Sequence, residues 1–290
     1  MFDNIFAAIE KWMRELLTGM VESNMSTMFT DVNEKTSEIA ARVGRTPQNW
    51  NSSVFSMIQN LSESVVVPIA GIIITLVLCY ELISMLTERN NLHDVDTWMF
   101  FKYFVKAWVA IYLVSNTFTI TMAVFDVGQS VVNSASGIIN GETAIDVSSL
   151  SMQMQAAMAT MEIGELVVLA LETFLVSFCM KIMSVVITVI VYGRMIEIYL
   201  YTSLAPIPFA TMSNREWGHV GTNYFRGLFA LAFQAFLMMV CVAIYAALIS
   251  SVRISSNMHS ALIGVAAYTV ILCFSLMKTG SLSKQIFGSH

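Results

Sequence analysis

Long, uninterrupted apolar runs constrain the fold of this chain more than any other feature of its sequence. The first of them, VVVPIAGIIITLVLCYELISML, is long enough to cross the ~30 Å hydrocarbon core of a bilayer as an α-helix. Charged residues make up 12% of the 290 residues and hydrophobic residues 56%, and a soluble domain has no interior that could bury so much apolar surface. The sequence therefore predicts an all-α, polytopic helical membrane protein with about five spans, near residues 65–86, 104–125, 166–190, 225–249 and 259–277.

Composition and motifs exclude several classes of function. Lys and Arg number 15 against 20 Asp and Glu, so the chain has no basic surplus for binding a nucleic-acid backbone as its main task. The four cysteines lie inside apolar runs without CxxC or Cys/His spacing, which indicates buried thiols rather than disulfides or a zinc site. HExxH, GxSxG, P-loop and GxGxxG motifs are absent. We therefore expect no catalytic residues, no metal and no cofactor, and a protein that is not an enzyme.

The N-terminal residues 1–63 are predicted to form a small helical module outside the membrane, and residues 64–290 the transmembrane domain. The first twenty residues, MFDNIFAAIEKWMRELLTGM, place their apolar residues on one helical face and their charges mostly opposite. A helix of this kind lies in a membrane interface or packs on a partner, and we favour the interface. The predicted amphipathic face consists of Phe2, Ile5, Phe6, Ile9, Trp12, Met13 and Leu16.

The apolar text between residues 166 and 203 is nearly twice as long as one span requires, so it must bend, extend beyond the membrane or break. Pro206 and Pro208 mark a definite break, because neither can continue a helix. We call residues 193–224 the elbow, and expect its Pro-broken segment to be re-entrant or interfacial. Its candidate docking residues for a partner are Pro206, Pro208, Asn214, Arg215 and Trp217, and a plain turn capped by its own polar side chains is the equal alternative.

The distribution of positive charge favours five spans over six. The loop 126–163 contains no Lys or Arg, which predicts an outer loop with a small helix or two, whereas a six-span arrangement would export several basic residues. The predicted topology places the N-terminus outside and the C-terminus in the cytoplasm. Rings and lysines at the start of the second span predict membrane-interface anchors at Trp98, Lys102, Lys106 and Trp108.

Charged residues inside spans are costly and are candidates for lining a pathway. They are Glu81, Glu172, Lys181, Arg194 and Glu197. Glu81 is more simply a snorkelling acid near a span end. Glu172 and Lys181 lie on opposite faces of one helix, so each needs a partner elsewhere or faces water. Arg194 and Glu197 are three apart and are expected to pair with each other.

Four stretches of the chain resemble the TrbL-like polytopic membrane components of type IV secretion, or conjugation, machines, in the branch found on conjugative elements of Gram-positive bacteria. The resemblance covers about residues 1–280 and is most specific from Ala205 to Gly218. The stretches are VPIAGIIITLVLCYELI, NNLHDVDTW, NTFTITMAVFDVGQSVVN and VYGRMIEIYLYTSLAPIPFATMSNREWGHVGTNYFRGLFALAFQAFLMMVCVAIYA.

This resemblance implies an extracytoplasmic N-terminus, about five spans in the cell membrane and a cytoplasmic C-terminus. It implies a non-enzymatic subunit at the base of a translocation channel, in contact with lipid, with the machine's ATPases and with extracytoplasmic channel components. It also implies a ring-like homo-oligomer that helps to pass single-stranded DNA with its attached relaxase, and that touches this substrate only transiently.

Two other functions are compatible with the residues. A solute transporter or permease would use Glu172 and Lys181 as its coupling pair, although the two halves of the chain show no repeat typical of transporters. A small polytopic scaffold would have no pathway of its own. Of these functions, only the transporter is expected to move a solute across a membrane that contains this protein alone.

Overall fold

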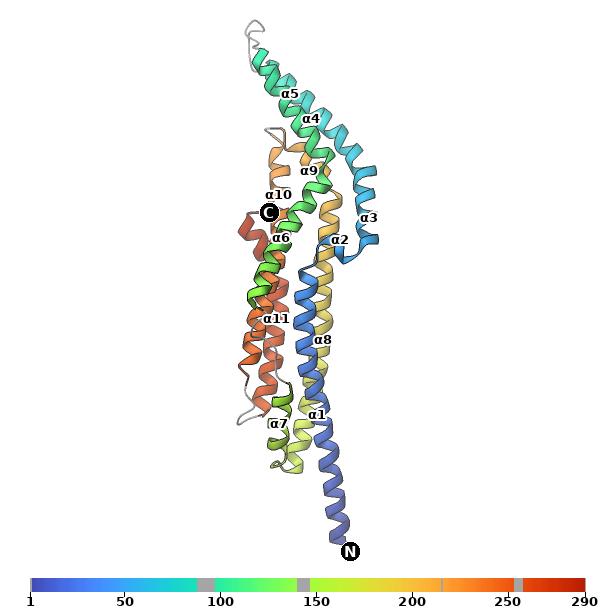
Figure 1. Cartoon of the computed structure of the whole chain (residues 1–290), viewed down its shortest axis with the longest axis vertical. Helices are drawn as coiled ribbons and strands as arrows, with labels where there is room; N and C mark the ends of the chain where they lie inside the picture. The colour runs from blue at the N-terminus through green and yellow to red at the C-terminus, as the bar shows by residue number, and fades with distance from the viewer. Residues whose placement is uncertain (1, 88–96, 140–146, 215, 253–257, 290) are drawn as a thin grey trace. The chain divides into compact units, whose positions relative to one another are not determined.

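The protein is helical, with no strand, over the residues that the computed structural model describes, which are 2–87, 97–139, 147–214, 216–252 and 258–289. This confirms the predicted all-α class (Figure 1). The helices are α1 (Phe2–Val43), α2 (Pro47–Trp50), α3 (Ser52–Leu61), α4 (Val67–Thr87), α5 (Thr97–Ser115), α6 (Thr117–Ile139), α7 (Val147–Met158), α8 (Ile163–Ser203), α9 (Pro206–Thr211), α10 (Gly218–Ser250) and α11 (Met258–Phe287).

Five helices of the described chain are long and apolar enough to cross a membrane, as the sequence predicted. They are α5, α8, α10, α11 and a continuous helix Ser52–Thr87, which joins α3 to α4 through the π-helical turn Ser62–Val66. This turn ends two residues before Pro68, whose missing N–H leaves a carbonyl in the preceding turn without its usual donor. The short helix α9 has six residues, too few to cross a bilayer, so it adds no sixth span.

The second span differs from its predicted limits. The sequence placed it at 104–125, whereas the candidate span is α5, and a new helix begins at Thr117. The side-chain amide of Asn116 donates to the Tyr112 carbonyl at 2.9 Å, and the Thr117 hydroxyl donates to the Leu113 carbonyl at 2.8 Å. Such side-chain bonds compete with the backbone ladder and interrupt a helix. The predicted loop 126–163 holds the second part of α6 and all of α7.

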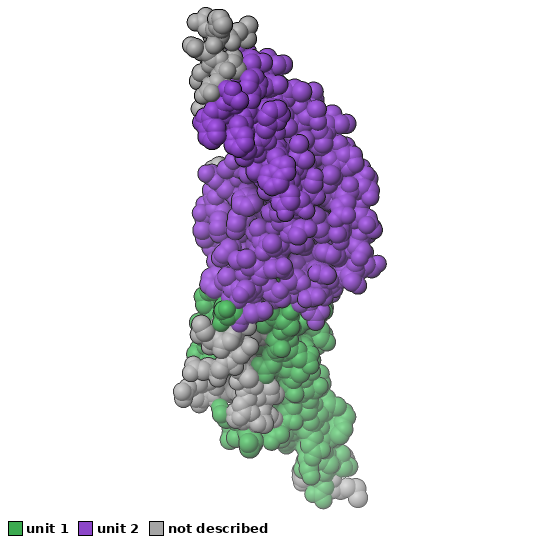
Figure 2. All heavy atoms as spheres, turned by 45° about the horizontal axis from the view of Figure 1, so that its top comes forward, with its two compact units in different colours: residues 1–43, 134–191, 238–278 green, residues 44–133, 192–237, 279–290 purple. Residues whose placement is uncertain are grey.

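Contacts divide the chain into two compact units, coloured separately in Figure 2. Unit 1 consists of residues 1–43, 134–191 and 238–278, and unit 2 of residues 44–133, 192–237 and 279–290. The boundary between them falls inside α6, α8, α10 and α11. This grouping differs from the predicted division at residue 63, and the location of residues 1–63 outside the membrane stays a prediction.

In unit 1, α1 runs beside the first part of α8 and contacts α7 (Figure 1). The guanidinium of Arg14 donates to the Met161 carbonyl at 2.7 Å, just before α8 begins. Further along both helices, the Ser177 hydroxyl donates to the Asn24 carbonyl at 3.3 Å. Residue numbers rise together on the two helices, so α1 and α8 lie parallel.

In unit 2, aromatic side chains link the remaining helices. Trp50 of α2 packs edge-on against Tyr192 of α8 at 5.4 Å between ring centroids. The Tyr199 hydroxyl donates to the Pro47 carbonyl at 2.6 Å, which fixes α2 on α8. The stacked rings of Tyr201 and Tyr224, 4.5 Å apart, join α8 to α10. These contacts place the end of α8, and with it the elbow, in a defined position within unit 2.

Candidate functional site

The elbow is organised around α9, which packs against both α4 and α5 within unit 2. Pro206 lies in the first turn of α9, where a missing N–H costs nothing, and it is buried, whereas Pro208 is half-buried. The prolines therefore end α8 and begin a short buried helix instead of an exposed loop. The apolar cluster around them contains Ala70, Ile74, Leu78, Ala110, Val114, Ala205, Phe209, Ala210 and Tyr224.

Helix α10 approaches α9 so closely at Gly221 that a side chain has no room. A Cβ atom built there would lie 2.5 Å from the Pro208 carbonyl oxygen and 2.1 Å from Cγ of Met212. The same carbonyl accepts a hydrogen bond from the Thr211 hydroxyl at 2.8 Å, which fixes it in place. Glycine at this position is thus a packing requirement of the elbow.

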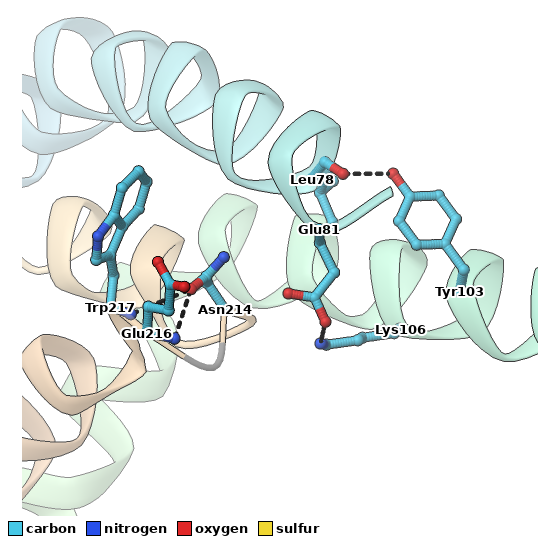
Figure 3. Close-up of polar contacts among 7 residues, drawn as sticks. All are labelled: Leu78, Glu81, Tyr103, Lys106, Asn214, Glu216 and Trp217. Atoms are coloured by element: carbon cyan, nitrogen blue, oxygen red, sulfur yellow. Dashed lines mark hydrogen bonds and ion pairs between the residues drawn. The ribbon is translucent and has the colours of Figure 1, made fainter. Parts of the chain in front are cut away.

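The turn between α9 and α10 is organised by Asn214, which is buried (Figure 3). Its side-chain oxygen accepts hydrogen bonds from the backbone N–H groups of Glu216 at 2.7 Å and Trp217 at 3.1 Å. Asparagine side chains stabilise turns in this way by replacing a backbone acceptor. The role of Asn214 in the structure is therefore to shape the turn. Arg215, predicted beside it as a docking residue, lies outside the described residues.

Tyr80 of α4 attaches this turn to the first span. Its hydroxyl lies 3.0 Å from each carboxylate oxygen of Glu216, to which it donates. Its ring stacks on the indole of Trp217 at 5.7 Å, with 18° between the ring planes. Trp217 nevertheless keeps 44% of its surface exposed. The indole is thus held in one orientation and still offers a face to a partner.

Glu81, the next residue on α4, forms an ion pair with Lys106 of α5 at 2.5 Å (Figure 3). One turn earlier, the Leu78 carbonyl accepts a hydrogen bond from the Tyr103 hydroxyl at 3.0 Å. These bonds fasten α4 to α5 next to the elbow. Lys106, predicted as an interface anchor, is therefore also the partner of a predicted pathway residue.

The other predicted interface anchors lie on exposed surface of α5. The rings of Trp98 and Trp108 are both exposed, and the ammonium group of Lys102 lies 5.6 Å above the Trp98 ring centroid. Such a cation–π contact keeps a lysine beside an aromatic ring. Their function as anchors at a membrane interface stays a prediction.

Arg194 and Glu197 do not pair with each other, which corrects the sequence interpretation. Glu197 pairs with Lys284 of α11 at 3.0 Å, and Arg194 donates to the Leu231 carbonyl of α10 at 3.3 Å. Three residues apart on a helix, the two side chains diverge enough to reach different neighbouring helices. Arg194 is buried, and its Nε has no acceptor within the described part of the chain.

Glu172 and Lys181 of α8 have different surroundings within unit 1. The Glu172 carboxylate contacts Nδ1 of His259 on α11, so it forms a link between two helices. Lys181 is exposed on a face of α8 where the apolar side chains of Phe178 and Val185 are also exposed. The structure does not bring Glu172 and Lys181 together.

The predicted N-terminal amphipathic face is exposed along the first half of α1. The Phe2 side chain lies outside the described part of the structure. The other six residues of the face are all exposed, namely Ile5, Phe6, Ile9, Trp12, Met13 and Leu16. Arg14, on a different side of the helix, faces the start of α8. The face therefore has no cover within the described part of the chain.

Sequence reasoning missed three residues that hold the predicted ones in place, namely Tyr80, His259 and Lys284. Tyr80 lies 136 positions from Glu216, and His259 and Lys284 each lie 87 positions from their partner. No spacing rule connects residues so far apart. The described residues contain no group of three or more His, Cys, Asp or Glu able to hold a metal ion.

Comparison with known proteins identifies a family for this architecture. Residues 32–206 match the family of TrbL/VirB6 plasmid conjugal transfer like proteins, which is more than half of the chain. The match ends at Pro206, so most of the elbow lies beyond it. No curated protein and no solved structure matches the chain. A match of this extent, on a chain with five candidate spans, shows that the protein belongs to the TrbL/VirB6 plasmid conjugal transfer-like family.

Proposed function

We propose that the protein is a non-enzymatic membrane subunit of a type IV secretion machine, which contributes to assembly of the channel and to passage of its substrate. The substrate in this proposal is single-stranded DNA with an attached relaxase. The observation that carries the proposal is the family match over residues 32–206. Five candidate spans agree with a subunit embedded in the cell membrane.

The elbow is the surface that we assign to partner subunits. Asn214 and Tyr80 hold the turn on both sides, while Trp217 remains exposed. An aromatic side chain held in one rotamer loses little entropy when it binds, which suits a docking residue. The distribution of Lys and Arg supports a cytoplasmic elbow and C-terminus, with the N-terminus outside. Its partners there would include the machine's ATPases, and extracytoplasmic channel components would contact the opposite side.

A ring of identical subunits is the assembly that we propose around this channel. The exposed apolar faces of the N-terminal part of α1 and of α5 offer surface for contacts between copies and with lipid. DNA and relaxase would touch the subunit only during transfer, because the chain has no basic surplus.

A solute transporter is the competing function. The positions of Glu172 and Lys181, its expected coupling pair, do not support it. Glu172 is occupied by His259, and Lys181 faces away among apolar side chains. A coupling pair has to respond to one substrate site, and the structure gives these two residues no common site. The secretion function therefore has the stronger support.

An in-frame deletion of the gene is expected to abolish transfer of the element in a mating assay, and the wild-type gene supplied in trans is expected to restore it. Transfer unchanged by the deletion would contradict the proposal. A parallel flux assay in proteoliposomes that contain only this protein tests the transporter. Substrate-dependent flux that is lost in Glu172→Gln would favour that alternative.

Trp217→Ala is expected to reduce transfer about tenfold or more while the amount of protein in the membrane stays normal, because a fixed aromatic anchor contributes ~1–2 kcal/mol or more to an interface. Arg215→Ala is expected to act in the same direction. Trp217→Phe is the matched control, since it keeps a ring to stack on Tyr80. Normal transfer by both alanine variants would remove the elbow as a docking site.

A further inference from the structure

The second half of α1 has two faces of opposite chemistry. One face is fully packed, with seven apolar side chains of which none is more than 4% exposed: Val21, Met25, Met28, Phe29, Val32, Ile39 and Val43. The opposite face is exposed and polar, with residues that recur at helical spacing: Ser23, Ser26, Thr27, Thr30, Glu34 and Ser37. We call this second set the polar stripe. At 3.6 residues per turn its members form one line along the helix.

The second half of α1 lies alongside helices that are candidate membrane spans, with its packed face toward them. Within unit 1, Asn24 bonds to Thr173 at 3.5 Å and accepts from Ser177. Further along, Asp31, Val32 and Ile39 line one small cavity with side chains of three other helices. Those side chains are Met180, Ser184 and Ile187 of α8, Tyr245 of α10, and Thr269 and Leu272 of α11. The second half of α1 therefore follows α8 over many residues (Figure 1), and the polar stripe lies on the side of α1 that faces away from these contacts.

The outward face of α8 at the same height is apolar. Its exposed side chains are Leu171, Phe174, Leu175, Phe178, Ile182, Val185 and Val189, broken only by Lys181. A face of this composition on a membrane protein contacts lipid. Thr173 and Ser177, which bond to α1, lie among these positions in the sequence but on the other side of the helix. Unit 1 thus has a lipid-compatible side and, beside α1, a polar side at the same depth.

We infer that the polar stripe of α1 lines a water-filled path at the depth of the membrane spans. Hydrocarbon is a poor cover for this face. The Thr27 hydroxyl does donate to the Ser23 carbonyl at 2.7 Å, but the exposed carboxyl group of Glu34 is costly to place in lipid without a polar partner. An apolar protein surface is an equally poor cover for this face, because it too offers no polar partner to these groups. Water can form hydrogen bonds with every polar group of the stripe at once, the exposed Glu34 included.

The first half of α1 contrasts with the stripe and marks where the path ends. On the same side of the helix, Ile9, Trp12 and Leu16 are exposed and apolar. Arg14 bonds to Met161, just ahead of α8, so the residues before it extend past the start of that span. The exposed side of α1 thus changes from apolar to polar at about residue 21, close to where α1 begins to run beside α8. The pathway residues are then on α1, in the part of the chain that sequence alone assigned to a module outside the membrane.

This inference concerns water access and does not depend on which substrate the machine carries. The experiment uses the full chain in its own membrane, with Cys79, Cys179, Cys241 and Cys273 replaced by alanine. Single cysteines are introduced on the stripe by Ser26→Cys, Thr30→Cys and Ser37→Cys. Matched controls on the exposed face of α8 are Phe174→Cys and Val185→Cys, and Met28→Cys tests the buried side of α1.

A methanethiosulfonate that carries a trimethylammonium group is added to the cells, and the remaining free thiols are counted by a gel-shift maleimide. We expect the three stripe positions to react at least about tenfold faster than the controls, because only a hydrated thiol ionises and meets a charged reagent. Stripe positions as slow as Phe174→Cys would overturn the inference. Slow labelling with disulfides between copies at Thr30→Cys would also overturn it, since the stripe would then be a protein interface. The deletion assay and the labelling assay can fail separately. If deletion of the gene leaves transfer intact but the stripe cysteines label fast, the role in conjugation is excluded and the water path is still supported.

Discussion

Gly221→Ala is expected to destabilise the packing of α9 against α10 by about 1–3 kcal/mol, the usual cost of adding atoms to a filled core. The new Cβ atom would lie 2.5 Å from the Pro208 carbonyl oxygen, which is backbone and is held by Thr211. The Met212 side chain can rotate away, but the carbonyl cannot move without shifting α9 off α4 and α5. Gly221→Leu is expected to be worse and to lower the amount of folded protein in the membrane.

The measurement is the temperature at which the detergent-purified protein loses its monodisperse state, together with transfer in a mating assay. Gly264→Ala in α11 is the matched control, because a Cβ atom there meets nothing within 4 Å. Alanine is the better helix former by about 1 kcal/mol, so this control is expected to be neutral or slightly stabilising. Equal effects of the two substitutions would show that the contact between Gly221 and Pro208 does not matter for stability.

Asn214→Ala is expected to cost about 2 kcal/mol, since it removes a turn-capping acceptor and leaves two backbone donors without it. The N–H groups of Glu216 and Trp217 both point at the lost oxygen. Because Trp217 would then be free to leave Tyr80, we expect transfer to fall together with thermal stability. This distinguishes the variant from Trp217→Ala, which should reduce transfer alone.

Asn214→Asp provides the control for this prediction, because it keeps an acceptor oxygen at the same place. We expect the aspartate variant to retain most of its stability and transfer. If alanine and aspartate behave alike, the hydrogen bonds to the turn are not what holds the elbow, and α9 packing alone must do so.

Several features of the fold could be predicted from local sequence. The apolar runs predicted the helical class and the number of candidate spans, and the prolines at 206 and 208 predicted the break after α8. These features depend on residues that are close in the chain, where helical periodicity, length and a missing N–H act directly. The helix boundary at residue 116, inside the predicted second span, was not foreseen, because the side chain of Asn116 competes with the helix, an effect that hydropathy does not contain.

The candidate site was predictable only in part. The sequence indicated the elbow and the charged residues in the spans, but it assigned Arg194 and Glu197 to each other. The partner of Glu197 is Lys284, and that of Glu172 is His259, both on α11. The need for glycine at 221 was equally invisible, because it arises from the carbonyl of Pro208 on another helix.

The amino-acid sequence by itself determined that this protein is a helical membrane protein, how many of its helices are candidate spans, and where the prolines break them. Those outcomes follow from the free energy of apolar surface in lipid and from backbone chemistry, both of which are local. Only the tertiary structure decided which charge pairs with which, why Gly221 has no side chain, and that α1 runs beside α8 with its polar stripe on the face away from it. These depend on how closely helices from distant parts of the chain approach one another, and no local pattern of residues specifies that approach.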